Sequence, residues 1–112
     1  MNNSEKLKEL ILQTIDDQKG QDVLCIPLQS KSDIADYIII SSGTSSKHIF
    51  SIKEKIYENI KKSGYKKISI EGEDGLNWIV IDLEDIIIHL FKPEVRDYYN
   101  LEKIWNYETN KL

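Results

Sequence analysis

Residues 78–91 read Trp-Ile-Val-Ile-Asp-Leu-Glu-Asp-Ile-Ile-Ile-His-Leu-Phe. Two apolar runs rich in β-branched residues flank an acidic centre, a pattern typical of two β-strands joined by a tight turn. With Leu83-Glu84 as a two-residue turn, the expected cross-strand pairs are Asp82 with Asp85, Val80 with Ile87, and Trp78 with His89. Leu-Glu is a poor sequence for such a turn, so a longer or bulged turn could shift the pairing by one residue.

Side chains alternate along a strand, so this hairpin has two different faces. One face is purely aliphatic and suits a core: Ile79, Ile81, Ile86, Ile88 and Leu90. The other face is mixed: Trp78, Val80, Asp82, Asp85, Ile87, His89 and Phe91. Two hypotheses account for the mixed face. Either a helix covers it and Trp78 and Phe91 are core residues, or it is a docking surface with aromatic anchors and a polar rim.

The N-terminal third predicts one helix and two strands. Ser4 is placed to cap a helix whose inward face is Leu7, Leu10, Ile11 and Ile15, and Gly20 is placed to end it. The range Val23 to Leu28 predicts a strand near a sheet edge, because Pro27 cannot donate to a ladder. The range Tyr37 to Ser41 predicts a strand inside the sheet, because it is apolar on both faces.

The middle of the chain predicts a turn and a second helix. Gly43-Thr44-Ser45-Ser46 precedes a helix with the inward stripe Ile49, Ile52, Ile56 and Ile60. The side chains expected to look outward are Lys53, Glu54, Lys55, Glu58 and Lys61. Gly64 is placed to end this helix, and residues 67–71 predict a third strand. A short helix is expected after Pro93, since proline fits a first helical turn.

The expected order is therefore α-β-β-α-β-β-β-α. It predicts an α/β (α+β) fold with a five-stranded sheet and helices. A chain of 112 residues has the length of one domain. We assign that domain to residues 1–107 and a short tail to residues 108–112.

Net charge and composition limit the classes of partner and the cellular compartment that we expect for this protein. The net charge of −4 argues against a general nucleic-acid binder and is compatible with a basic protein partner. Cys25 lies in an apolar run and is interpreted as a small buried side chain. The sequence has neither an apolar run of membrane-spanning length nor the layout of a signal peptide at its start, so we expect a cytoplasmic protein.

Three patterns could indicate a phosphate-binding loop, a metal site or a pair of catalytic carboxylates, and each has a simpler structural explanation. The hydroxyl-rich turn of residues 42–48 resembles a phosphate loop, but helix capping by Thr44 or Ser45 explains the same residues. Asp82, Asp85 and His89 could be assembled into a metal site, but such a site needs convergent geometry and usually a third or fourth protein donor. The two aspartates at a turn are more often solvated or partner-facing than catalytic. We therefore expect no cofactor, no metal and no catalytic residue.

Several motifs together resemble those of the Iojap family of ribosomal silencing factors. They are Ala35-Asp36-Tyr37, Ser42-Gly43-Thr44-Ser45 with His48, Glu71-Gly72 before Trp78, Asp82 with Asp85, His89, and the closing stretch from Tyr99 to Trp105. Two positions depart from the family pattern. Glu84 stands where the family usually has glycine, and Asn100 where it usually has aspartate.

The resemblance implies a fold similar to nucleotidyltransferases, with a mixed sheet and flanking helices. It implies a protein that binds the large ribosomal subunit through ribosomal protein L-fourteen, blocks joining of the small subunit and lowers translation when nutrients run short. Free members of the family are commonly dimers. The residues expected to bind are the mixed face, extended by Arg96 and Tyr98, with Tyr99 more buried.

The alternative is a nucleotidyltransferase-like enzyme or nucleotide-binding domain. Such an enzyme would need an Asp-x-Asp pair to hold magnesium. This pair is missing from the strand that follows Ser42-Gly43.

Overall fold

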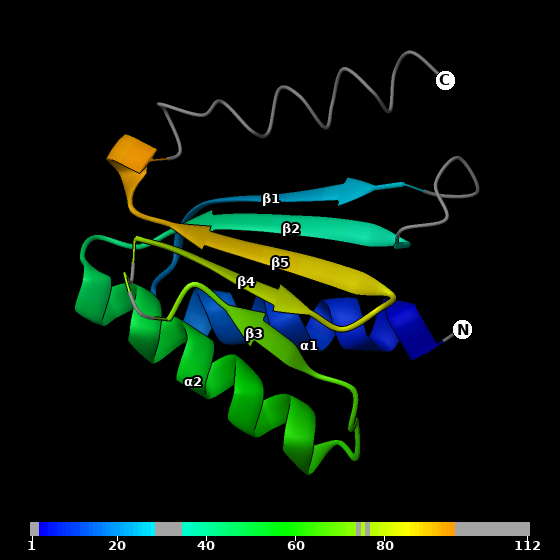
Figure 1. The fold of residues 1–112 in the computed structure, drawn as a ribbon. Coiled ribbons are helices and arrows are strands. Elements are labelled where there is room, and N and C mark those ends of the chain that lie inside the picture. The colour runs from blue at the N-terminus through cyan, green and yellow to red at the C-terminus, as the bar shows by residue number, and fades with distance from the viewer. Residues whose placement is uncertain (1–2, 29–34, 74, 76, 96–112) are drawn as a thin grey trace.

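A five-stranded mixed sheet carries both long helices on one face (Figure 1). The computed structural model describes residues 3–28, 35–73, 75 and 77–95. The elements are α1 (Asn3–Asp17), β1 (Gln21–Pro27), β2 (Tyr37–Ser42), α2 (Ser46–Lys62), β3 (Ser69–Glu71), β4 (Trp78–Asp82) and β5 (Ile86–Phe91). The order of these elements is the expected one. After Pro93 a helical turn begins at residues 93–95, and the rest of the predicted last helix lies outside the described residues.

The strands lie in the order β1-β2-β5-β4-β3. The β2–β5 pair is parallel and the other three pairs are antiparallel. The β4–β5 hairpin therefore places β5 at the centre of the sheet, with β2 beside it. Strand β1, which ends at Pro27, lies at an edge as the proline predicted.

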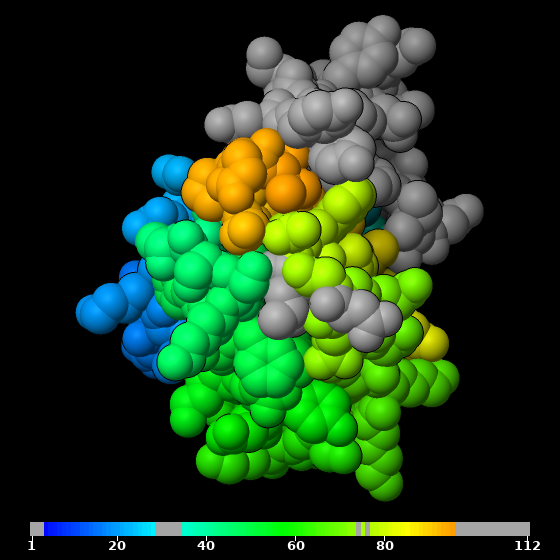
Figure 2. All heavy atoms as spheres, turned by 60° about the vertical axis from the view of Figure 1, so that its left-hand side comes forward, coloured from blue at the N-terminus to red at the C-terminus, as the bar shows by residue number. Residues whose placement is uncertain are grey.

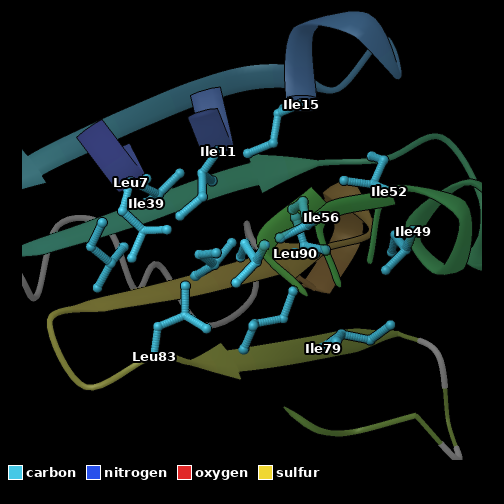
Figure 3. Close-up of a cluster of buried hydrophobic side chains, with 14 residues drawn as sticks. Leu7, Ile11, Ile15, Ile39, Ile49, Ile52, Ile56, Ile79, Leu83 and Leu90 are labelled. Atoms are coloured by element: carbon cyan, nitrogen blue, oxygen red, sulfur yellow. The ribbon is translucent and has the colours of Figure 1, made fainter. Parts of the chain in front are cut away.

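The aliphatic face of the hairpin is the floor of the main core. All five of its side chains have no exposed surface: Ile79, Ile81, Ile86, Ile88 and Leu90. The inward stripe of α2 covers them together with Leu7, Ile11 and Ile15 of α1 (Figure 3). Because every one of these contacts is aliphatic, burial of apolar area holds the two helices on this face. Cys25 packs against the same cluster, but it is half-buried rather than fully buried as expected.

The helix ends follow the sequence signals only in part. Ser45 is the N-cap of α2 and accepts from the backbone N–H of His48, as the capping explanation predicted. Gly64 has a φ of +93° after the last turn of α2, as expected of a terminating glycine. The prediction for α1 was wrong at both ends. Ser4 lies inside the helix, and the left-handed residue after it is Lys19 rather than Gly20.

Lys53 was predicted to face solvent and is instead buried, with 3% of its surface exposed. Its ammonium group pairs with Glu54 and, at 2.6 Å, with Glu73 in the loop before β4, and it lies over the ring of Phe50. Burial lowers the pKa of Lys53, but the hydrogen bonds to Glu54 and Glu73 outweigh it and the net pKa is raised. The ammonium is therefore charged and ties α2 to that loop.

The register of the β4–β5 hairpin differs from the expected one. The pairs are Trp78 with Phe91, Val80 with His89, and Asp82 with Ile87, a shift of two residues. The turn residues are Glu84-Asp85, because the N–H of Leu83 donates to the carbonyl of Ile86. A shift of two keeps every strand side chain on its predicted face. Only Asp85, which is now in the turn, leaves the mixed face.

The turn forces Glu84 into a left-handed conformation with a φ of +72°. The side chain of Asp82 supports it by accepting from the N–H of Glu84 at 2.8 Å. A left-handed residue with a side chain costs roughly 1–2 kcal/mol, and glycine avoids this strain. We expect Glu84→Gly to raise the free energy of unfolding by about 1 kcal/mol in urea titrations. A loss of stability would show that the Glu84 side chain, which lies 3.6 Å from Lys67, matters more than the strain.

Candidate docking surface

On the mixed face of the hairpin, one side chain is buried and the others are half-buried or exposed. Phe91 has no exposed surface and packs with Ile38 and Ile40 of β2, as the core hypothesis expected. The half-buried side chains are Trp78, Val80, Ile87 and His89, and Asp82 beside them is exposed. We call these five residues the docking patch. They combine aromatic, aliphatic and acidic character in the way that anchors and rim do at protein interfaces.

Trp78, His89 and Phe91 form one ring cluster across the two strands. The centroids of Trp78 and Phe91 are 5.1 Å apart, and the rings of His89 and Phe91 are stacked at 5.8 Å with an interplanar angle of 4°. The buried Phe91 thus supports both half-buried rings from within the protein. This support fixes the orientation of Trp78 and His89 before any partner arrives.

A hydrogen bond fixes the chemical state of His89. The indole Nε1–H of Trp78 donates to His89 Nδ1 at 3.1 Å. Because an indole nitrogen can only donate, Nδ1 must be unprotonated, and a neutral His89 then carries its proton on Nε2. Burial lowers the pKa of His89 to about 4, which agrees with a neutral ring at physiological pH.

Acid is expected to destabilise the fold through His89. The unfolded imidazole takes up a proton below its ordinary pKa of 6.5, whereas the folded one resists protonation until about pH 4. The stabilisation from neutral His89 is therefore complete above pH 6.5 and is lost as the pH falls towards 4. Between about pH 7.5 and about pH 5 this loss should reach about 2 kcal/mol. Urea titrations of wild type and His89→Phe measure it. Equal acid sensitivity of the two proteins would contradict this expectation.

Gly72 sets the position of Trp78 in a way that the sequence pattern did not reveal. It has a φ of +91°, and a Cβ built on it would overlap the carbonyl oxygen of Trp78. Only glycine allows both this backbone conformation and this close approach. The Glu71-Gly72 motif before Trp78 therefore has a physical reason: it lets the chain leave β3 directly against the start of β4.

The positions of the two aspartates at the turn end of the hairpin also differ from the prediction. Asp82 is exposed on the mixed face, but Asp85 lines a cavity of about 530 Å³ on the helix side, with Lys6, Leu7 and Leu10 of α1. The expected pairing of Asp82 with Asp85 across the strands was wrong because the turn lies one residue later. Of the two aspartates, the structure places only Asp82 in the docking patch.

The hydroxyl-rich turn before α2 is occupied by structural contacts. His48 Nε2 is 2.8 Å from the carbonyl oxygen of Gln18, and Nδ1 accepts from the N–H of Thr44 at 2.9 Å. The imidazole therefore links the end of α1 to the start of α2. Close by, the backbone N–H of Gly43 donates to the carbonyl of Phe91, and that of Lys92 donates to the carbonyl of Asn77, so the turn before α2 and the residue before β4 meet the end of β5. Figure 2 shows this side of the molecule, with the segment after β5 in orange beside the start of α2 and the start of β4.

Within the described residues, no group of histidine, cysteine, aspartate and glutamate has the arrangement of a metal site. The same residues contain no helix that is long and apolar enough to cross a membrane. Arg96 and Tyr98, predicted to extend the docking surface, and Tyr99, predicted to be more buried, lie outside the described residues.

Comparison with known proteins identifies the family. The sequence matches the family described as "Ribosomal silencing factor during starvation" over residues 1–111. The chain belongs to this RsfS family. A ribosomal silencing factor RsfS of Zymomonas mobilis is 42% identical over 103 residues, which cover 92% of this chain and 77% of that protein. The one from Bacillus subtilis is 32% identical over 103 residues, which cover 92% and 87%.

A solved structure of a protein from Bacillus halodurans has the same fold. It superimposes with a TM-score of 0.81 at 31% identity, covering 90% of this chain and 94% of that chain. The resemblance to the Iojap family of ribosomal silencing factors is thus confirmed. Glu84, where the resemblance led us to expect glycine, has a left-handed backbone that glycine would adopt without strain.

Proposed function

We propose that this RsfS family member binds the large ribosomal subunit through ribosomal protein L-fourteen and thereby blocks joining of the small subunit. The mechanism is occupancy: the bound protein fills space that the small subunit needs, and no catalysis is involved. Translation falls as a result, especially when nutrients are limiting. The protein acts in the cytoplasm, where it meets free subunits, and it forms homodimers when free.

The docking patch is the observation that carries this proposal. Trp78, Val80 and Ile87 offer apolar surface that the domain leaves half-exposed, and the ring of Phe91 beneath Trp78 holds the anchor in place. Preorganised aromatic anchors surrounded by a polar rim supply most of the binding free energy at many protein interfaces. Arg96 and Tyr98, which follow β5 in the sequence, extend the patch in this proposal.

Cosedimentation tests the binding step. Purified protein should pellet with isolated large subunits at about one copy per subunit and should stay in the supernatant with small subunits alone. Addition of excess free ribosomal protein L-fourteen should release it. Equal pelleting with both subunits would contradict a specific site on the large subunit.

The rim charge at Asp82 is expected to tune binding through electrostatics. Rim charges mainly change the association rate and its dependence on salt. We expect Asp82→Asn to weaken binding about threefold and to reduce the slope of affinity against salt concentration. Asp85→Asn removes the same charge from the same end of the hairpin but on the helix side, so it is the matched control. An unchanged salt slope for Asp82→Asn, or equal effects of the two variants, would count against a basic partner surface at Asp82.

The rival function, a nucleotidyltransferase-like enzyme, makes a different prediction. Its phosphate loop would be the turn before α2, where Ser45 caps the helix and His48 bonds the backbone. Calorimetry with ATP and magnesium separates the two functions. Stoichiometric binding of the nucleotide would favour the enzyme over the steric blocker.

A further inference from the structure

The ring cluster decides which hydrogen-bonding groups the docking patch can offer. The single N–H of Trp78 is used within the protein by His89 Nδ1, so Trp78 cannot donate to a partner through it. The side chains of Val80 and Ile87 carry no polar atoms, and the carboxylate of Asp82 can only accept. Of the five side chains of the docking patch, His89 alone retains a donor.

That donor is the Nε2–H of His89. The hydrogen bonds of the described residues leave Nε2 without an acceptor, and the side chain is half-buried rather than enclosed. The stacked ring of Phe91 holds the plane of the imidazole, and Trp78 holds its Nδ1 edge. The donor is therefore fixed in both direction and protonation state, as a specific contact requires.

We propose that His89 Nε2–H is the hydrogen-bond donor of the docking patch and donates to a carbonyl oxygen of the ribosomal protein. This inference rests on the proposed function. A neutral carbonyl fits better than an anionic oxygen, because the carboxylate of Asp82 lies on the same face, two pairs further along the strands from the Val80–His89 pair. Trp78 then acts as an apolar anchor and as the group that sets the tautomer of His89.

Nitrogen-15 NMR of the histidine rings tests the first half of this inference in the free protein. A neutral ring with the proton on Nε2 is expected at neutral pH, assigned through loss of the signal in His89→Phe. Trp78→Phe removes the indole donor and should allow the Nδ1–H tautomer to appear. A charged His89, or an Nδ1–H tautomer in the wild type, would overturn the proposal.

Two amide substitutions test the second half. Asparagine at this position keeps an acceptor near Nδ1 and lacks the outer donor, whereas glutamine places an amide nitrogen near Nε2. In cosedimentation with large subunits, His89→Asn should weaken binding about tenfold, because a partner carbonyl loses its donor. His89→Gln should stay within about threefold of wild type. Thermal unfolding of both variants checks that they remain folded under the binding conditions.

The outcomes separate the donor role from the function on which it rests. Wild-type binding with equal losses in the two variants, or with no loss in His89→Asn, would overturn the donor role and leave the proposed function standing. Absence of wild-type binding to large subunits would overturn the proposed function and the docking role of His89 together.

Discussion

Trp78→Ala is expected to weaken binding to the large ribosomal subunit by at least about 30-fold, because truncating an aromatic anchor typically costs about 2 kcal/mol or more. Trp78 is half-buried, stands at the start of β4 and packs on Phe91. Truncation of Trp78 removes apolar contact with the partner and also removes the hydrogen bond from the indole Nε1–H to His89 Nδ1. Equilibrium binding to isolated large subunits, with circular dichroism of the free variant, measures both effects.

Tyr57→Ala is the matched control. Tyr57 is an aromatic residue of α2, 36% exposed, on an element that packs against the opposite face of the sheet. Its truncation should leave binding within about twofold of wild type. If Trp78→Ala unfolds the protein, the core hypothesis for Trp78 is correct. If it folds and binds like Tyr57→Ala, the docking patch is wrongly placed.

Gly72→Ala is expected to lower the free energy of unfolding by about 2–4 kcal/mol. The added Cβ would meet the carbonyl oxygen of Trp78, which is backbone and cannot move away without disturbing the start of β4. The positive φ adds its own cost. Because the displaced backbone carries the anchor, binding to the large subunit should fall in the fraction that stays folded.

Gly64→Ala separates the two causes. Gly64 has a φ of +93°, close to that of Gly72, but a Cβ there would meet nothing within 4 Å. It should therefore show only the cost of the left-handed backbone, about 1 kcal/mol. Urea titrations of the two variants give the difference. Equal losses of unfolding free energy in the two variants would mean that the clash between the added Cβ and the Trp78 carbonyl oxygen does not contribute to the destabilisation.

Alternation of side chains was enough to predict the two faces of the β4–β5 hairpin. The predicted faces were correct although the predicted turn was wrong, because a register shift of two residues leaves each side chain on the same face of the sheet. The turn itself was not predictable from propensity, since Glu84 occupies a conformation that favours glycine and is held there by Asp82 and the strand pairing. Asp85 was misplaced for the same reason.

Helical periodicity predicted the inward isoleucines of α2 but not the burial of Lys53. Its partner Glu73 lies in a loop 20 residues further along the chain, and a pattern within one helix contains no information about such a contact. The docking patch was predictable as a mixed face. The hydrogen bond from Trp78 to His89 was not, because it depends on a pairing register that only the folded hairpin defines.

An assay of subunit joining shows whether the bound protein acts as a steric blocker. Isolated large subunits are incubated with the protein, small subunits are added, and joined ribosomes are quantified on sucrose gradients. We expect joining to fall in proportion to the fraction of large subunits occupied, and Trp78→Ala to restore it while Tyr57→Ala inhibits like wild type. Undiminished joining at saturating occupancy of the large subunit would contradict the account, because a bound protein that leaves joining intact is not a steric blocker.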